Sequence, residues 1–377
     1  MNTTVTNSER SVAGTVIAEI FLIFVCISAI IGNTCMWIII YRTRKLRTIS
    51  NAFILCLNSA DWLVSVLNMP TTVVALALGR WPLSSQACQV FGFFNMFTLV
   101  QSVLSLCNIS INRYVIVCKP FRFPSIYTTK RSIMMIIVCT SISIIISIPP
   151  LFGWAEYGYV DTQFYCFCLW PKSPSYAFFM IGVCFGIPLT VMAICNVLIF
   201  TAVQASKKRT ARSSRSSMAI SKNISIQESS SDTEVPTKTE KKKKDKPETE
   251  NKKERKHVDM VDVQVEMSDS NTETNDVKKR LSKLPSNKVK AEDVRLALAL
   301  AICVVCFFIS WFPFCISMLI GIYAPNSVSN DFHLATLLIG YSNSCMNPVI
   351  YGIINKRIGK GFKDLFCRCR CCKEEKL

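Results

Sequence analysis

The chain has 377 residues, of which 50% are hydrophobic and 18% are charged. Soluble globular domains carry roughly 25% charged residues, so this composition is typical of a membrane protein instead. The formal net charge of +18 does not indicate nucleic-acid binding, because no nucleic-acid-reading module accompanies it. We expect most of the excess charge to lie in connections that face anionic membrane lipid.

The apolar residues occur in long blocks, and a block of about 18 or more residues with few charges predicts a membrane-spanning helix. Seven blocks follow one another in the chain: residues 14–41, 51–78, 87–118, 132–152, 176–203, 294–323 and 332–354. The first ten residues are polar rather than basic, so we expect no cleavable signal peptide and a first block that acts as a signal anchor.

Lysine and arginine residues follow blocks one, three, five and seven, whereas the alternate connections contain few of them. By the positive-inside rule the basic connections are cytoplasmic, and an odd number of spans then places the N-terminus outside the cell. Asn2 begins an Asn-Thr-Thr acceptor for N-glycosylation on that side. An unused tripeptide is the alternative interpretation.

Residues 204–293 separate blocks five and six and include the run TEKKKKDKPETENKKERKH. The segment has almost no aromatic residues and cannot bury enough apolar surface to fold, which predicts a disordered cytoplasmic loop. It is a passive linker, a phosphorylation region or a basic lipid-binding patch. Helix is expected to resume near its end, at KAEDVRLALAL.

Polar residues recur at particular places inside the blocks, where they are candidates for functional sites. Block two contains Asp61, and block three ends in Asn112-Arg113-Tyr114. Block six contains SWFP around Trp311, and block seven contains NPVIY from Asn347 onward. In this order and topology the landmarks resemble those of the rhodopsin-like, or class A, G protein-coupled receptors. The resemblance covers all seven blocks.

This resemblance implies an all-α membrane protein: a seven-transmembrane helix bundle with a short amphipathic cytoplasmic helix. The implied organisation is an extracellular tail (1–13), helices one to five (14–203), the disordered loop (204–293), helices six and seven (294–354), and an amphipathic helix with a tail (355–377). It implies a plasma-membrane receptor rather than an enzyme, with a heterotrimeric G protein as partner and arrestin and kinases at the long loop. A multi-pass transporter is the alternative class, but we see no inverted repeat or broken half-helix.

The same resemblance assigns a switch at the cytoplasmic end. Arg113 matches the arginine of the family's D/E-R-Y motif and would pair with Asp293 on helix six, although a snorkelling interfacial arginine is the alternative. Asn112 stands where the family usually has an acid. The residues implied in G-protein coupling are Asn112, Arg113, Tyr114, Asp293, Asn347, Pro348 and Tyr351.

The resemblance also implies a sodium ion beside Asp61, since oxygen ligands suit a hard cation. The implied sodium-binding residues are Asp61, Ser102, Asn343, Ser344 and Asn347, with Trp311 as the lid of the pocket. The alternative is a protonated Asp61 within a polar hydrogen-bond network.

The implied ligand pocket is apolar with a few neutral polar groups: Phe91, Asn95, Met96, Leu99, Trp311, Phe314 and Tyr341. Opsin-like features occur in PPLFGW and VIYGIINKR, but a retinal Schiff base needs a lysine, and the matching position is Tyr341. Amine receptors need an aspartate on helix three, and the matching position is Asn95. We therefore expect a neutral or lipophilic small ligand, or a melatonin-like one. A peptide ligand, or high basal activity without a ligand, stays open.

Two groups of cysteines stand apart from those scattered in the spans. Cys88 lies on the oxidising side, where we expect a disulfide with Cys166 or Cys168. Melatonin-receptor-like loops correspond to Cys166, which we favour, and opsin-like loops to Cys168. The second group follows the amphipathic stretch and predicts palmitoylation rather than a metal site. Its members are Cys367, Cys369, Cys371 and Cys372.

Overall fold

The computed structural model describes residues 12–228 and 291–374. The chain divides into two units, residues 1–205 with 289–377 and residues 206–288. The first unit contains the helix bundle, and the second contains the continuation of one of its helices. The expected glycosylation site at Asn2 and most of the long loop lie outside the described residues.

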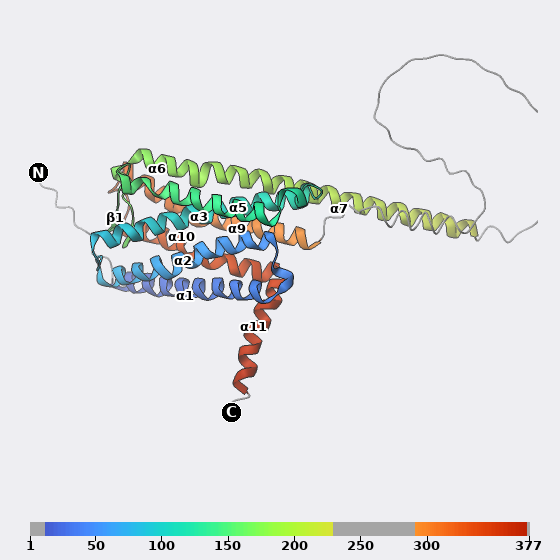
Figure 1. Cartoon of the computed structure of the whole chain (residues 1–377), viewed down its shortest axis with the longest axis horizontal. Coiled ribbons are helices and arrows are strands. Elements are labelled where there is room, and N and C mark those ends of the chain that lie inside the picture. The colour runs from blue at the N-terminus through green and yellow to red at the C-terminus, as the bar shows by residue number, and fades with distance from the viewer. Residues whose placement is uncertain (1–11, 229–290, 375–377) are drawn as a thin grey trace, which may run out of the picture. The chain divides into compact units, whose positions relative to one another are not determined.

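The seven expected spans are all helical, and their helices lie side by side (Figure 1). The long helices are α1 (Val12–Arg42), α2 (Ile49–Leu78), α3 (Ser85–Cys118), α5 (Thr129–Ser147), α6 (Pro174–Ile181) with α7 (Ile187–Glu228), α9 (Ala291–Tyr323) and α10 (Asn330–Ile354). Short elements join them: 3₁₀ turns at Arg44–Leu46, Pro149–Phe152 and Trp170–Lys172, and the helix α4 (Phe123–Ile126). In the described part of the chain, six helices are long and apolar enough to cross a membrane; α10 is more polar and is not among them.

Side-chain caps fix where several of these helices begin. The hydroxyls of Thr48, Ser84, Thr128 and Ser329 each accept a hydrogen bond from the backbone N–H three residues ahead. Such caps satisfy backbone donors that the first helical turn leaves without partners. At the other end of α2, Gly79 adopts a left-handed conformation with φ +66°. Glycine reaches that conformation without a steric penalty and so ends the helix there.

The fifth span differs from a regular helix in two respects. A π-helical turn at Gly182–Gly186 separates α6 from α7. Pro188 cannot donate its backbone nitrogen to the preceding turn, and the flanking glycines leave room for a wider turn. The second difference is length, since α7 continues to Glu228 instead of ending at residue 203. The expected boundary of the loop at 204 is therefore wrong for its first 25 residues. Their Ala-, Lys-, Arg- and Ser-containing sequence has no proline or glycine to stop the helix.

Two short strands make an exception to the all-α expectation. β1 (Tyr157–Val160) and β2 (Tyr165–Cys168) pair antiparallel, with Tyr157 opposite Cys168. We call this pair the hairpin, and the end of the bundle that it covers the hairpin end. A disulfide between Cys88 and Cys166 joins β2 to the start of α3. Cys168, the other candidate, keeps a buried free thiol, and burial raises its pKa to about 12.

After α10 the chain turns into α11 (Lys356–Glu374), which leaves the bundle across the direction of α10 (Figure 1). The Asn355 side-chain oxygen accepts hydrogen bonds from the backbone N–H groups of Arg357 and Ile358. This cap fixes the corner between the two helices. The four cysteines expected to be palmitoylated fall in α11, but their side chains lie outside the described residues.

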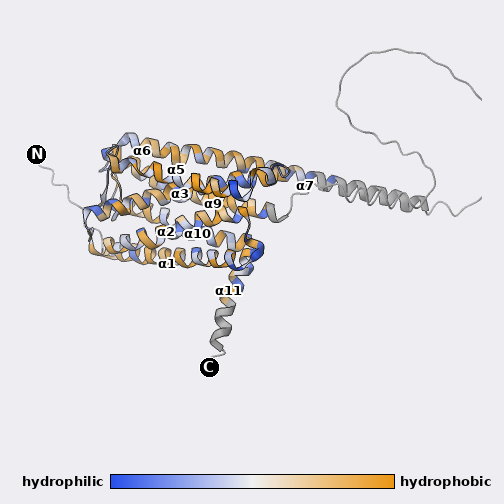
Figure 2. Ribbon diagram, viewed as in Figure 1, coloured by the Kyte–Doolittle hydropathy of each residue, from blue (hydrophilic) through white to orange (hydrophobic). Residues whose placement is uncertain are grey.

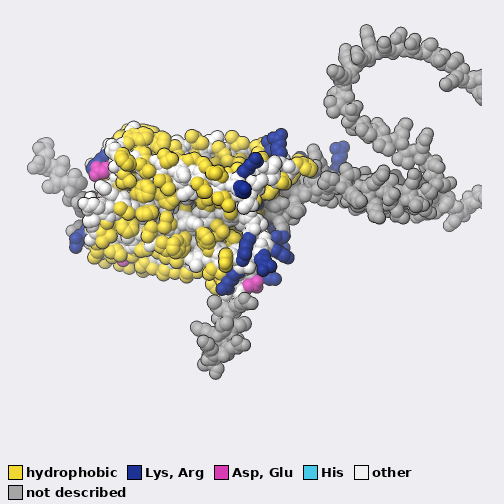
Figure 3. All heavy atoms as spheres, viewed as in Figure 1, with side chains coloured by type: hydrophobic (Ala, Val, Ile, Leu, Met, Phe, Trp, Pro, Cys, Tyr) yellow, Lys and Arg dark blue, Asp and Glu magenta, His cyan; other side chains and the backbone are white. Residues whose placement is uncertain are grey.

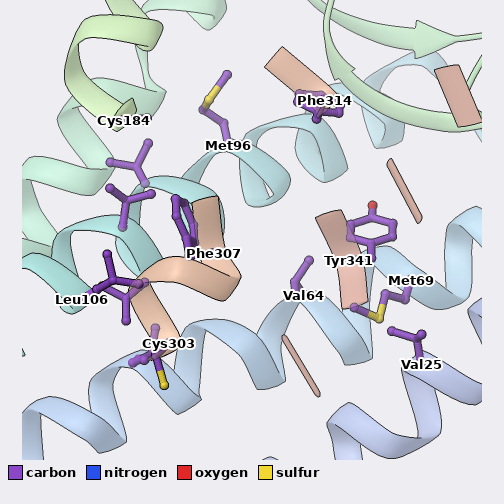
Figure 4. Packing of buried hydrophobic residues seen from close by; sticks show 14 of the residues in the cluster. Val25, Val64, Met69, Met96, Leu106, Cys184, Cys303, Phe307, Phe314 and Tyr341 are labelled. Atoms are coloured by element: carbon purple, nitrogen blue, oxygen red, sulfur yellow. The ribbon is translucent and has the colours of Figure 1, made fainter. Parts of the chain in front are cut away.

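Polarity in the bundle is distributed as expected for a protein in lipid. Figure 2 shows hydrophobic residues along the bundle helices, and Figure 3 shows apolar side chains over the flank with Lys and Arg gathered near the end where α11 leaves. We call that end the basic end. The exposed fraction reaches 67% for Phe24 and 77% for Ile353, while Asn33, Asn58 and Asp61 are buried. An apolar core cluster still fills the interior, where side chains from α1, α2, α3, α9 and α10 meet (Figure 4).

Candidate functional site

A narrow cavity of about 30 Å³ lies between the hairpin and the bundle interior. A cavity needs roughly 10–15 Å³ of this kind of volume to hold one water molecule, so this one has room for very little. The protein's own side chains fill most of the space between the helices at this point. The lining residues come from α2, α3, β2, α9 and α10: Asp61, Val64, Asn95, Thr98, Leu99, Ser102, Tyr165, Phe167, Trp311, Phe314, Leu337, Tyr341, Asn343 and Ser344.

Asn95 links three elements around this cavity. Its Nδ2 donates to the backbone carbonyl of Cys166 at 3.0 Å. Its Oδ1 accepts a hydrogen bond from the Tyr341 hydroxyl at 3.3 Å. Both side chains are buried, so neither hydrogen bond competes freely with bulk water. The neutral amide therefore ties α3 to the hairpin on one side and to α10 on the other.

Aromatic rings form the remaining wall and continue into the core. Phe167 of β2 packs edge-on against Phe314 at 6.1 Å between ring centroids, and Phe314 packs edge-on against Trp311 at 5.5 Å. Trp311 then contacts Phe307 at 6.4 Å. A Cβ on Gly340 would lie 3.0 Å from the Trp311 ring, so glycine permits this close approach of α9 and α10. The rings connect the hairpin to the buried middle of α9.

Five of the seven residues expected in the ligand pocket line this cavity: Asn95, Leu99, Trp311, Phe314 and Tyr341. Phe91 instead packs edge-on against Trp81, at 5.7 Å between centroids. Met96 is fully buried in the interior cluster and does not line the cavity.

Sequence reasoning missed the contribution of the hairpin. Tyr165 and Phe167 both line the cavity, and Cys166 between them forms the disulfide. Alternate residues of a strand point to the same face. The alternation of YCFC was the signal that could have placed both rings over the pocket. Thr98 and Leu337 were also missed, because nothing in their local sequence distinguishes them from packing residues.

The residues expected around a sodium ion do converge on Asp61, whose side chain is 2% exposed. Asn347 Nδ2 donates to Asp61 Oδ2 at 2.8 Å, and the Ser102 hydroxyl donates to Asp61 Oδ1 at 3.4 Å. Asn343 and Ser344 line the same cavity as Asp61. One buried carboxylate surrounded by neutral oxygen-bearing groups is a donor set that fits a hard monovalent cation. The helix α1 supports this region, since Asn33 Nδ2 donates to the backbone carbonyl of Ser344 at 3.1 Å.

A second cavity, of about 460 Å³, opens at the basic end. Arg113, which is 3% exposed, lines it together with Arg295 and Leu296 of α9. The same cavity is lined by Lys45, Lys356 and Arg357, so its wall is strongly cationic. The side chain of Asp293, the expected partner of Arg113, lies outside the described residues, so that pairing stays a prediction.

The other residues of the expected switch lie near this end. Asn112 is buried and interacts with Tyr127, which follows α4. Burial raises the pKa of Tyr127 above its usual value, and the interaction with Asn112 offsets part of that rise. Tyr114 packs under the Lys119 ammonium group, 5.4 Å from the ring centroid.

On α10, Pro348 lies against α1, where a Cβ on Gly32 would approach it to 3.1 Å. Tyr351 is fully buried in the core cluster. Both residues therefore hold the C-terminal part of α10 against its neighbours.

Comparisons with known proteins agree with this architecture. The family model described as 7 transmembrane receptor (rhodopsin family) matches residues 32–351. The alpha-1A adrenergic receptor of Oryzias latipes is 28% identical over 361 residues, which cover 95% of this chain and 67% of the relative. The Homo sapiens alpha-1A adrenergic receptor is 26% identical over 345 residues, covering 90% and 66%. This chain thus spans about two thirds of the length of these relatives.

A solved structure supports the same fold. The crystal structure of squid rhodopsin matches with a TM-score of 0.66 and 20% sequence identity, covering 95% of this chain and 87% of the rhodopsin chain. The family match extends from Gly32 within α1 to Tyr351 of α10 and includes every landmark from Asp61 onward. The transporter alternative is therefore excluded, and the chain belongs to the rhodopsin-like, class A family of G protein-coupled receptors.

Proposed function

We propose that this receptor binds a neutral or lipophilic small ligand from outside the cell and activates a heterotrimeric G protein. The observation that carries the proposal is the Asn95 amide, which is hydrogen-bonded to both the hairpin and Tyr341. Asn95 lines the cavity with a neutral amide, and the Asp61 carboxylate in the same wall already accepts hydrogen bonds from Asn347 and Ser102. A ligand cation there would lose water without gaining a charge partner at position 95, which is costly.

The proposed orientation follows from charge. Lys and Arg gather at the basic end, which we assign to the cytoplasm, and the hairpin end to the outside. The plasma membrane is the proposed location, with the N-terminus extracellular. The cavity at the basic end, with Arg113 in its wall, is then the proposed site for the G protein. We also propose arrestin and kinases as partners of the long loop between α7 and α9.

Two ligand chemistries are disfavoured by single residues. The relatives above are named adrenergic receptors, but Asn95 supplies no carboxylate for an amine. Retinal attachment needs an amine nucleophile, and Tyr341 is a phenol. We therefore expect no borohydride-trappable retinal adduct within the spans of the purified protein. Detection of such an adduct would contradict this assignment.

We further propose that a sodium ion binds beside Asp61 and favours the inactive receptor. Asp61 would supply the negative charge, and Ser102, Asn343, Ser344 and Asn347 the surrounding polar groups. Such an ion would offset the cost of a buried carboxylate. If agonist binding closes this pocket, linkage requires agonist and sodium to weaken each other's binding by the same factor.

The proposal is tested by nucleotide exchange on a panel of co-expressed G proteins, with neutral, amine and peptide ligands added separately. We expect responses to neutral ligands only. The variant Leu99→Trp should abolish them by filling the cavity, while Phe91→Trp, outside the cavity, should retain them. A response to an amine that survives Leu99→Trp would show that the ligand binds elsewhere.

A further inference from the structure

A third cavity, of about 20 Å³, lies between the fifth and sixth spans, and its wall includes side chains of α3, α6, the π-helical turn and α9. The two spans pack together here, since Phe185 contacts Phe307 at 6.1 Å between ring centroids. Leu99, Trp311 and Phe314 line both this cavity and the first one, so they form a shared wall. We call it the sulfur pocket and define it by its four sulfur-bearing residues, Met180, Cys184, Cys315 and Met318.

The four sulfur atoms of the pocket come in two pairs. Met180 and Cys184 are four residues apart on the fifth span, and side chains at this spacing lie on one face of a helix. Cys315 and Met318 are three residues apart on α9 and share a face for the same reason. Met180, Cys184 and Met318 are buried, while Cys315 is partly exposed. The Cys184 and Cys315 thiols are close enough to interact electrostatically, so the two pairs meet across the pocket.

The size and the lining of the sulfur pocket limit what it can hold. Roughly 10–15 Å³ of such volume accommodates one water molecule, so there is room for one small particle. A buried water molecule needs about two to four polar partners. Among the described residues, no charged, amide or hydroxyl side chain lines the pocket. Hard cations prefer oxygen ligands, so the pocket suits them no better than it suits water.

Sulfur ligands favour a soft cation, and the apolar wall favours a cation with a single charge. Thiolate and thioether groups select Cu(I). One cysteine thiol would release its proton to water on binding, and the charges of the thiolate and of Cu(I) would then cancel. The second thiol and the two thioethers would act as neutral ligands. A divalent ion bound in the same way would leave a net charge among apolar side chains, which is costly.

We propose that the sulfur pocket binds one Cu(I) ion through its two thioethers and two thiols. The bound ion links α9 to the fifth span, on the far side of Trp311 and Phe314 from the first cavity. It is separate from the proposed sodium site, whose ligands are oxygen-bearing groups around Asp61. Copper binding needs neither the proposed ligand nor a G protein, so its failure would leave the proposed function untouched.

The test uses the full-length receptor with its four C-terminal cysteines changed to serine, because those thiols would also bind Cu(I). Cu(I) is titrated without oxygen against a chromophoric chelator, and native mass spectrometry counts the bound ions. We expect one ion per receptor. A pH indicator in weakly buffered solution should report the release of about one proton for each ion bound.

Paired methionine variants test the thioether ligands. Met180→Leu/Met318→Leu removes both thioethers and nearly conserves side-chain volume, so the fold should survive. Loss of an outer-shell partner of a metal already costs about 10–100-fold in affinity, so loss of two ligands should weaken binding by more than about 100-fold. The matched control is Met69→Leu/Met192→Leu, at two fully buried methionines outside the pocket. It should change the Kd for Cu(I) by less than about twofold.

Removal of the thiols tests the charge argument. Cys184→Ala/Cys315→Ala should abolish both Cu(I) binding and proton release. Cys195→Ala/Cys303→Ala, at two buried free cysteines outside the pocket, should keep both. Thermal unfolding of each variant without metal separates a loss of fold from a loss of ligands.

Three results would overturn the proposal. The first is a receptor with the serine-substituted tail that binds no Cu(I). The second is equal weakening of Cu(I) binding in a pocket variant and in its matched control, which would indicate adventitious binding to scattered sulfur groups. The third is an X-ray absorption spectrum of the bound copper that shows oxygen or nitrogen neighbours in place of sulfur.

Discussion

Replacing Asp61 by asparagine should remove the sensitivity of the receptor to sodium while leaving the fold intact. In the structure the two carboxylate oxygens accept hydrogen bonds from Asn347 Nδ2 at 2.8 Å and from the Ser102 hydroxyl at 3.4 Å. An asparagine of nearly the same shape can still accept from Asn347 through its oxygen. Its amide nitrogen can donate to the Ser102 oxygen, so neither neighbour is left without a partner.

The expected change in stability follows from the cost of burying the carboxylate and from the strength of its two hydrogen bonds. Burying a carboxylate costs several kcal/mol, and two hydrogen bonds to a charged group return about 1.5–3 kcal/mol each. In Asp61→Asn the desolvation cost largely disappears, and neutral bonds of about 0.5–1.5 kcal/mol remain. We therefore expect the free energy of unfolding in the absence of sodium to fall by no more than about 1 kcal/mol. A bound cation at ten times its Kd stabilises the unmodified receptor by about 1.4 kcal/mol.

The assay is thermal unfolding of purified receptor in sodium chloride or choline chloride at equal ionic strength. The unmodified protein should unfold at a higher temperature in sodium, and Asp61→Asn should unfold at the same temperature in both salts. Asp161→Asn, an exposed carboxylate in the hairpin turn, is the matched control and should keep the sodium effect. If the unmodified receptor shows no sodium effect, the ion-binding argument fails and a protonated Asp61 in a polar network is favoured.

The remaining predictions concern the switch, α11 and the disulfide. Asn112→Asp should lower basal nucleotide exchange up to about tenfold at equal surface expression. The reason is that an acid can form a charge-assisted hydrogen bond with the neighbouring Arg113, worth about 1.4 kcal/mol more than a neutral one. Unchanged or higher exchange would refute this. Gly359→Ala should reduce the free energy of unfolding by about 1–3 kcal/mol, because the added Cβ overlaps α10. The control is Gly321→Ala, whose Cβ meets nothing within 4 Å. Equal unfolding temperatures for the two variants would contradict the prediction. Cys166→Ser should lower the unfolding temperature as much as reduction does, since the disulfide spans 78 residues of chain, whereas a similar loss in Cys168→Ser would count against this pairing.

The sequence predicted the helices well because their signal is strong over many residues. The sixth span, expected at 294–323, is α9 at Ala291–Tyr323. The hairpin was not predicted, because each strand has only four residues and periodicity over so short a segment is ambiguous. The π-helical turn was not predicted either, for a related reason. Hydropathy does not distinguish a π turn from an α turn, and only Pro188 with the two preceding glycines, Gly182 and Gly186, indicates one.

For the site, sequence landmarks identified which helices contribute but only partly which faces. Asn95, Leu99 and Ser102 repeat at helical spacing and all line the cavity. Met96 follows Asn95 by one residue and therefore points about 100° away around α3. Phe91 lies one turn above Asn95, but there it contacts Trp81, which itself packs against Tyr159 of the hairpin. The position of the hairpin decides where the cavity ends, and no pattern within α3 contains that information.

The polarity of α10 has a consequence for how the chain is inserted into the membrane during synthesis. Among the bundle helices in the described part of the chain, it is the one that length and composition do not identify as a membrane span, and it buries Asn343, Ser344 and Asn347. Each polar group is costly in hydrocarbon until a partner is present. Asp61 of α2 accepts a hydrogen bond from the Asn347 side chain, and Asn33 of α1 donates to the backbone carbonyl of Ser344; both are translated long before α10. We therefore expect the last helix to enter the bilayer more readily once the earlier helices are in place. Substitutions that remove a partner, such as Asp61→Leu, should lower the yield of inserted receptor, whereas Asp61→Asn keeps an acceptor for Asn347.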